Sequence, residues 1–129
     1  MFQPDQYAGF LQKQATEHLE VAKLMILKRK RYGAGLFFAH AALQNSFAAL
    51  ICKNTHNRPP WRSDLTRLAK LAKIRLTKEQ RELCKVMNFY HKEGLYLGLE
   101  YPEPTKKDAY DYWLQARIMI LTFSTSLAE

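Results

Sequence analysis

Apolar side chains recur in this chain at intervals of three and four residues, the period of an α-helix, and no segment of useful length alternates like a β-strand. The clearest case follows Pro4-Asp5, where small or apolar residues mark one face of a long helix: Ala8, Leu11, Ala15, Leu19, Ala22 and Ile26. The basic run 28–31 would end this helix, where positive charge suits the helix dipole. Gly33 and Gly35 are predicted to form the turn that follows.

A second helix, predicted over roughly 34–53, is apolar on nearly every side. Such a helix is either central in a bundle or buried in a dimer interface. Its most apolar stretch, Leu36 to Ile51, is too short to span a bilayer and contains polar residues, so no membrane association is expected. Residues 54–61 are predicted to form a loop, because the pair Pro59-Pro60 cannot continue a helix.

Three more helices are predicted after this loop. Ser63 is expected to cap a short third helix, Thr77 and Gln80 have capping-box spacing for a fourth, and Thr105 can cap a fifth after a loop at 94–104. The expected inner faces are Leu65, Leu68, Ala69 and Ala72, then Leu83, Val86, Met87 and Tyr90, then Ala109, Tyr112, Trp113, Ala116, Met119, Ile120, Phe123 and Leu127. The sequence therefore predicts an all-α, up-and-down bundle of about five helices in a single domain over residues 1–129.

Charge is unevenly distributed along the chain. The formal net charge of +8 divides into +3 over 1–52, +8 over 53–92 and −3 over 93–129. A basic middle segment suggests an anionic partner or charge-complementary self-association. Cys52 and Cys84 lack metal-site spacing and lie in apolar patterns, which predicts buried reduced thiols. The N-terminus has no basic start followed by an apolar run, so a cytoplasmic protein without a signal peptide is expected.

The search for catalytic motifs returns none. The chain has no Gly-rich phosphate loop, no GxSxG elbow and no HExxH motif. None of its four histidines lies four residues from another, so no metal site and no cofactor are expected.

Two groups of residues are nevertheless candidates for contact with a nucleotide or RNA. His40 and Gln44 point the same way from the apolar helix, either as a hydrogen-bonded strip at a helix contact or dimer seam, or as ligand contacts. The basic segment places cations beside an aromatic ring, which suits single-stranded nucleic acid, although solvated charges and a Trp61 that plugs the bundle end would fit equally. The candidate contact residues are His40, Gln44, His56, Arg58, Trp61, Arg62, Arg67 and Lys70.

The run 32–50, YGAGLFFAHAALQNSFAAL, resembles the signature helix of prokaryotic HEPN domains. The stretch that begins at Pro59-Pro60-Trp61 and the run Asn88-Phe89-Tyr90 are similar to later parts of the same pattern, and the resemblance covers about residues 8–127. It implies a helical bundle, commonly a homodimer, often paired with a minimal nucleotidyltransferase in toxin–antitoxin modules. Active members are metal-independent ribonucleases that use Arg and His in an R-x(4–6)-H motif.

This chain departs from that motif, because no His has an Arg five to seven residues before it. Without that cation, a His lacks the group that would stabilise charge developing on the phosphate. The expected function is therefore a non-catalytic binding module, homodimeric, that contacts a nucleotide, RNA or a nucleotidyltransferase partner. The alternatives are a divergent RNA-cleaving toxin using His40, His56 or His91 with Arg62, and a dimeric assembly protein with no small ligand.

Overall fold

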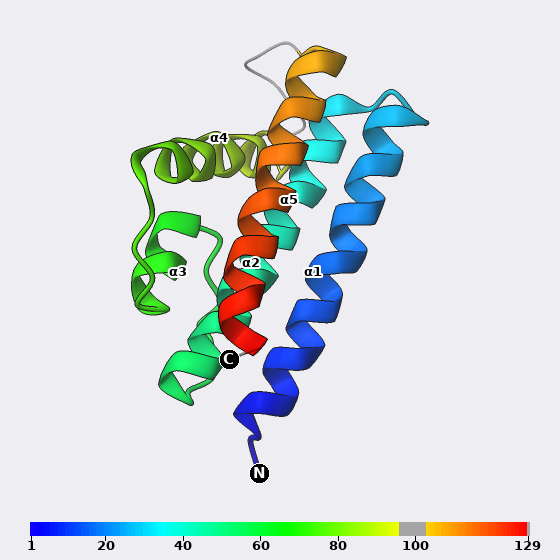
Figure 1. The fold of residues 1–129 in the computed structure, drawn as a ribbon. Coiled ribbons are helices and arrows are strands. Elements are labelled where there is room, and N and C mark those ends of the chain that lie inside the picture. Colours follow the sequence, from blue (N-terminus) through cyan, green and yellow to red (C-terminus); the bar gives the residue numbers. More distant parts are fainter. Residues whose placement is uncertain (96–102, 129) are drawn as a thin grey trace.

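The computed structural model describes residues 1–95 and 103–128, with side chains described for 1–92 and 103–124, and every regular element in this part of the chain is a helix (Figure 1). The elements in order are α1 (Pro4–Leu27), α2 (Tyr32–Thr55), α3 (Leu65–Leu71), α4 (Lys78–Leu95) and α5 (Lys106–Ala128). The predicted all-α bundle of five helices is confirmed.

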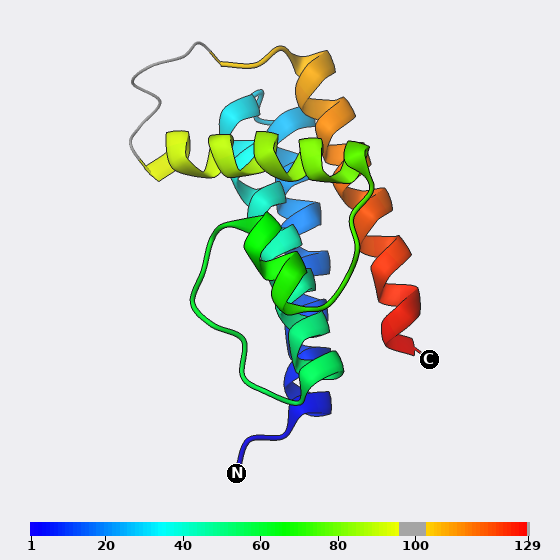
Figure 2. The same cartoon turned by 90° about the vertical axis from the view of Figure 1, so that its left-hand side faces the viewer.

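Helix α2 is the centre of the bundle, since it contacts each of the other four helices. α1 runs antiparallel to it, α5 packs against both, and α4 lies across them with the short α3 beneath it (Figures 1 and 2). Of the two interpretations of the apolar segment, the central helix is the observed one. By length and composition α2 could cross a membrane, but 72% of its most apolar window is buried inside the bundle, which accounts for its apolarity.

The α1–α2 contact follows the predicted pattern except at its turn. All six residues of the predicted α1 face are buried. The predicted turn at Gly33 and Gly35 is wrong, because both lie in the first turn of α2 and the chain reverses just before them, where Lys30 has φ 55°. Gly35 instead allows α1 and α2 to approach closely, because an added Cβ would lie 2.5 Å from Cγ1 of Ile26.

The predicted helix starts are confirmed at two of three places. Thr77 and Gln80 form the reciprocal capping box, with bonds of 2.8 and 3.1 Å, and the Thr105 hydroxyl accepts from the Asp108 amide. The predicted cap at Ser63 is wrong, because the Asp64 carboxylate caps α3. Helix α4 extends to Leu95, so the loop predicted from 94 begins later, and its residues 96–102 lie outside the described part.

The core confirms the expected thiols and most of the expected inner faces. Cys52 and Cys84 are both buried, and neither forms a disulfide. Burial raises the pKa of the Cys84 thiol to about 12. The buried indole N–H of Trp113 donates a 2.9 Å hydrogen bond to the Leu19 carbonyl, which fastens α5 to α1. The prediction for Leu127 concerns a side chain outside the described part.

Candidate nucleic-acid interface

Residues 56–64, the strap, connect α2 to α3 and run back along α2 (Figure 2). Two polar side chains of α2 hold its backbone. Gln44 Nε2 donates a 2.7 Å hydrogen bond to the Arg62 carbonyl, and His40 Nε2 lies 2.7 Å from the Ser63 carbonyl. Because a carbonyl only accepts, the proton of His40 is on Nε2. The polar strip of the apolar helix is thus a set of anchors for the strap.

The strap runs beside the C-terminal half of α2. At about 1.5 Å per residue, α2 rises roughly 18 Å from Gln44 to its C-cap His56. The strap bends at His56, Asn57 and Trp61. Between these bends Pro59 and Pro60 restrict its backbone, because proline fixes φ near the polyproline value.

The far end of the strap is tied to α4. Asn88 accepts a 3.0 Å hydrogen bond from the Leu65 amide and donates one of 3.0 Å to the Asp64 carboxylate. The same carboxylate accepts from the amide and hydroxyl of Thr66. Partial burial acts to raise the pKa of Asp64, but these hydrogen bonds outweigh it and lower the pKa. At neutral pH the Asp64 carboxylate is therefore ionised, and Asn88 and Thr66 already use its hydrogen-bonding capacity.

A stack of three rings lies behind the strap. His40 and His91 stack with centroids 4.2 Å apart, and His91 stacks in turn on Phe37 at 5.3 Å. Burial and the neighbouring His91 lower the pKa of His40 to about 4, although its hydrogen bond to Ser63 opposes the shift. Burial also lowers the pKa of His91. Both imidazoles are neutral near pH 7, and the buried Nδ1 of His40 has no hydrogen-bond partner.

The outer side of the strap presents an aromatic ring among cations. Trp61 is fully exposed, with 103% relative exposure, so it does not plug the bundle end. Arg62 is its neighbour on the strap, and Arg67 and Lys70 lie on exposed positions of α3. Within the described residues none of these three cations takes part in an ion pair. They are available to an anionic ligand.

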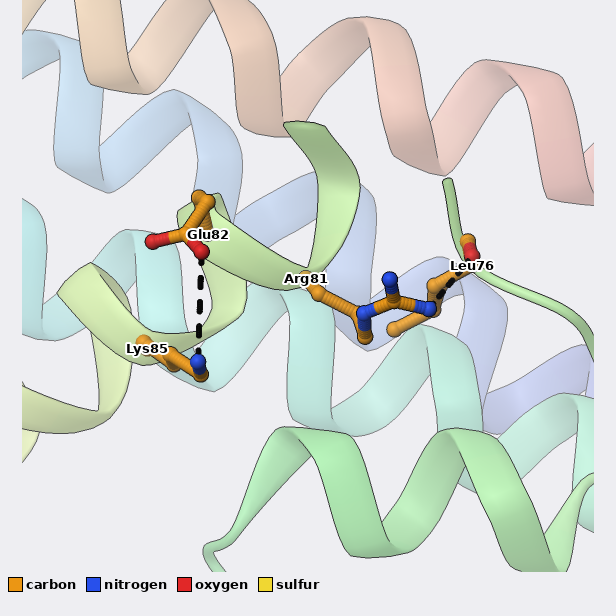
Figure 3. Close-up of polar contacts among 4 residues, drawn as sticks. All are labelled: Leu76, Arg81, Glu82 and Lys85. Carbon is orange, nitrogen blue, oxygen red and sulfur yellow. Dashed lines mark hydrogen bonds and ion pairs between the residues drawn. The ribbon is translucent and has the colours of Figure 1, made fainter. Parts of the chain in front are cut away.

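Other cations of the basic segment are occupied, as Figure 3 shows for α4. The Arg81 guanidinium reaches back to the Leu76 carbonyl at 3.3 Å, where it supports the connection between α3 and α4. Lys85 lies 3.9 Å from Glu82 on the exposed side of the same helix. Part of the positive charge in 53–92 is therefore structural or locally balanced.

The remaining predicted contacts lie at the other end of the strap. His56 is exposed and caps α2 in the left-handed conformation, with φ 60°. The Arg58 guanidinium sits 4.5 Å from the centroid of the Phe2 ring. The eight candidate residues thus divide into two buried or half-buried anchors, four exposed residues on the strap and two exposed cations on α3.

Sequence reasoning missed three residues that build this surface. Asp64 and Asn88 fix the strap to α3 and α4, and Phe2 receives Arg58. Asn88 carried a usable signal, since it is an amide on the inner side of an amphipathic helix beside the buried Met87. Phe2 carried none, because its partner is distant in the chain.

The exposed part of this surface offers groups that can bind a nucleic acid. An exposed indole has a face on which any base can stack, and nearby guanidinium and ammonium groups can neutralise phosphates. His40 is fully buried, so it supports the strap and does not reach the outer surface.

Comparison with known proteins gives one match. The family model of the HEPN domain matches residues 8–125, which is nearly the whole chain. No curated protein and no solved structure matches the chain significantly.

Proposed function

The chain belongs to the HEPN domain family, and from that membership and the strap we propose that it is a non-catalytic module that binds single-stranded RNA in a toxin–antitoxin-like system. The observation that carries the proposal is the fully exposed Trp61 on a backbone held by Gln44 and His40. An exposed indole beside cations combines the two features that single-stranded nucleic-acid binding uses, a ring on which a base can stack and charges that neutralise phosphates. The unpaired cations beside Trp61 favour an anionic ligand.

The proposal that the module is non-catalytic rests on the absent R-x(4–6)-H motif. One observation favours the alternative, an RNA-cleaving toxin. His91 is half-buried, neutral near pH 7 and stacked on the ring that anchors the strap, and a neutral imidazole can act as a general base. His40 is too deeply buried to touch a phosphate, so a divergent nuclease would have to use His91 or the exposed His56 with Arg62.

We also propose a homodimer and a nucleotidyltransferase partner in the cytoplasm. The apolar side chains of α2 are already packed within the chain, so a dimer would have to use another surface. Helix α5 offers Leu114 and Ile118, which are 36% and 54% exposed and lie four residues apart on one face. Sedimentation of Ile118→Lys against the parent chain tests this contact, and an unchanged dimer mass contradicts it.

The experiment that tests RNA binding follows Trp61 fluorescence while a labelled single-stranded RNA is added at low and high salt. Trp113 is buried, so a change in emission on binding reports on Trp61. We expect affinity to fall steeply as salt rises, because phosphate contacts release counterions. Trp61→Ala, whose binding is followed through the label on the RNA, should bind about 5- to 100-fold more weakly, the usual range for one stacked base.

A matched pair of variants separates contact from general charge. Arg67→Ala and Arg117→Ala each remove one exposed arginine, the first beside the strap and the second on α5. Only Arg67→Ala should weaken binding and reduce the salt slope. Equal effects would contradict the proposed surface. RNA cleavage that disappears in Arg62→Ala and in either His56→Ala or His91→Ala would establish the ribonuclease instead.

A further inference from the structure

A second group of aromatic rings lies at the start of α1. The Tyr7 and Phe10 rings stack with centroids 6.1 Å apart and planes at 16°, and the Phe2 ring meets Tyr7 edge-on at 5.8 Å. Phe2 is partly buried against a small cluster of α1 and α2 residues and anchors the group. Phe10 is 54% exposed and Tyr7 is 36% exposed. Bundle packing does not require these two rings.

The rings border a shallow hollow of about 300 Å³. Gln3, Gln6 and Arg58 line it with polar side chains, and Met1 also borders it. Gln3 precedes α1 but its side chain does not cap the helix, so that amide remains available. A primary amide has both donors and an acceptor, as the edge of a nucleobase requires. The volume lies at the lower end of that of ligand pockets and suits one planar ring system.

The hollow is continuous with the strap through Arg58, which belongs to the strap and covers Phe2 at 4.5 Å. An arginine guanidinium stacks on aromatic rings and on bases alike. The nearest carboxylate in the helix start, Asp5, lies 3.8 Å from the Lys53 ammonium, which offsets its charge. A strand that leaves Trp61 toward the α1 end therefore meets a cation and then exposed rings.

We propose that this hollow is a second base-binding pocket, in which Tyr7, Phe10 and Arg58 receive an unpaired base of the same RNA strand that stacks on Trp61. The inference rests on the proposed function and extends it by assigning the binding face a direction, from α3 along the strap to the start of α1. Stacking on Phe10 and Tyr7 supplies affinity, and the glutamine amides meet the base edge.

The test compares a short single-stranded RNA of about four nucleotides with a longer one of about twelve. Trp61→Ala should weaken the binding of both. Phe10→Ala should leave the short RNA unaffected and weaken the longer one about 5- to 100-fold, since only the longer strand fills both sites. Phe10 is exposed, so this substitution should leave the fold intact.

Two conservative variants distinguish stacking from plain apolar contact. Phe10→Leu keeps an apolar side chain but loses the ring, so it should behave like Phe10→Ala, whereas Phe10→Trp should retain the affinity for the longer RNA. Full binding of the longer RNA by Phe10→Leu, or self-association of the parent chain that Phe10→Ala abolishes, would overturn the pocket. If Trp61→Ala weakens RNA binding while Phe10→Ala does not, the pocket fails and the proposed function stands. If neither variant weakens it, both fail.

Discussion

The imidazole rings of His40 and His91 stack at 4.2 Å, and the burial of His40 in this stack, together with the neighbouring His91, makes the stability of the fold depend on pH. The pKa of His40 is about 4 in the folded chain and about 6.5 when unfolded. Between these values the unfolded chain binds a proton that the folded chain does not, so stability is full above about pH 6.5 and falls as pH falls toward 4. We expect a loss of roughly 2–3 kcal/mol from this group.

Urea unfolding at about pH 7.5 and about pH 4.5 measures this loss. Since carboxylates also titrate in this range, the comparison is with His40→Gln, which keeps a donor for the Ser63 carbonyl and should show a smaller loss. His56→Gln changes an exposed histidine and should retain the full pH dependence. Identical pH dependence in His40→Gln and the parent chain would refute the assignment.

The strap should loosen when Gln44 is replaced by alanine. The Arg62 carbonyl then loses its donor, which costs about 1 kcal/mol of unfolding free energy. Trypsin should cleave more quickly after Arg62, because the bond to Ser63 becomes more mobile. Gln115→Ala removes an exposed glutamine of α5 and should change neither quantity. An unchanged cleavage rate in Gln44→Ala would mean that the anchor is unimportant.

Two glycines should respond to alanine in opposite directions. Gly35→Ala places a Cβ 2.5 Å from Ile26 Cγ1 and 3.1 Å from the Ala22 carbonyl, so it should destabilise the chain by about 1–3 kcal/mol. Gly9 lies inside α1 with nothing within 4 Å of an added Cβ, so Gly9→Ala should stabilise by about 0.5–1 kcal/mol. Thermal or urea unfolding of the two variants measures the difference. Equal shifts would contradict the close α1–α2 contact.

The two tryptophans offer a similar comparison. Trp113→Phe removes the indole donor to the Leu19 carbonyl and leaves a smaller ring in the core, so it should cost about 1–3 kcal/mol from the lost hydrogen bond and the lost packing. Trp61→Phe alters a fully exposed side chain and should leave the unfolding free energy within about 0.5 kcal/mol. A large loss in Trp61→Phe would show that the strap packs differently.

The sequence predicts the helices of this fold well because each one carries its own period. On α1 every predicted inner residue is buried, and the capping box at Thr77 forms as expected. The predicted turn at Gly33 and Gly35 is wrong because glycine has two common uses, to reverse the chain and to let two helices approach closely. The sequence alone does not show which use applies. Only the position of Ile26 in space distinguishes them.

The candidate site was less predictable than the fold. The sequence indicated the basic segment and the aromatic residue within it, but left the exposure of Trp61 open. The roles of His40 and Gln44 depend on carbonyls that lie 23 and 18 residues away in the chain. Asp64 was missed in favour of Ser63 because both are good caps, and Asn88, contributed by α4, is what favours the carboxylate. Such choices are made by tertiary contacts that no local pattern contains.

The restricted backbone of the strap has a consequence for how a ligand is received. A flexible loop loses conformational entropy when it binds, and that loss subtracts from affinity. Here Pro59, Pro60 and the anchors at Arg62 and Ser63 have already removed part of that freedom during folding. The backbone that carries Trp61 and Arg62 is therefore ordered before a ligand arrives, and binding requires less further ordering of the chain.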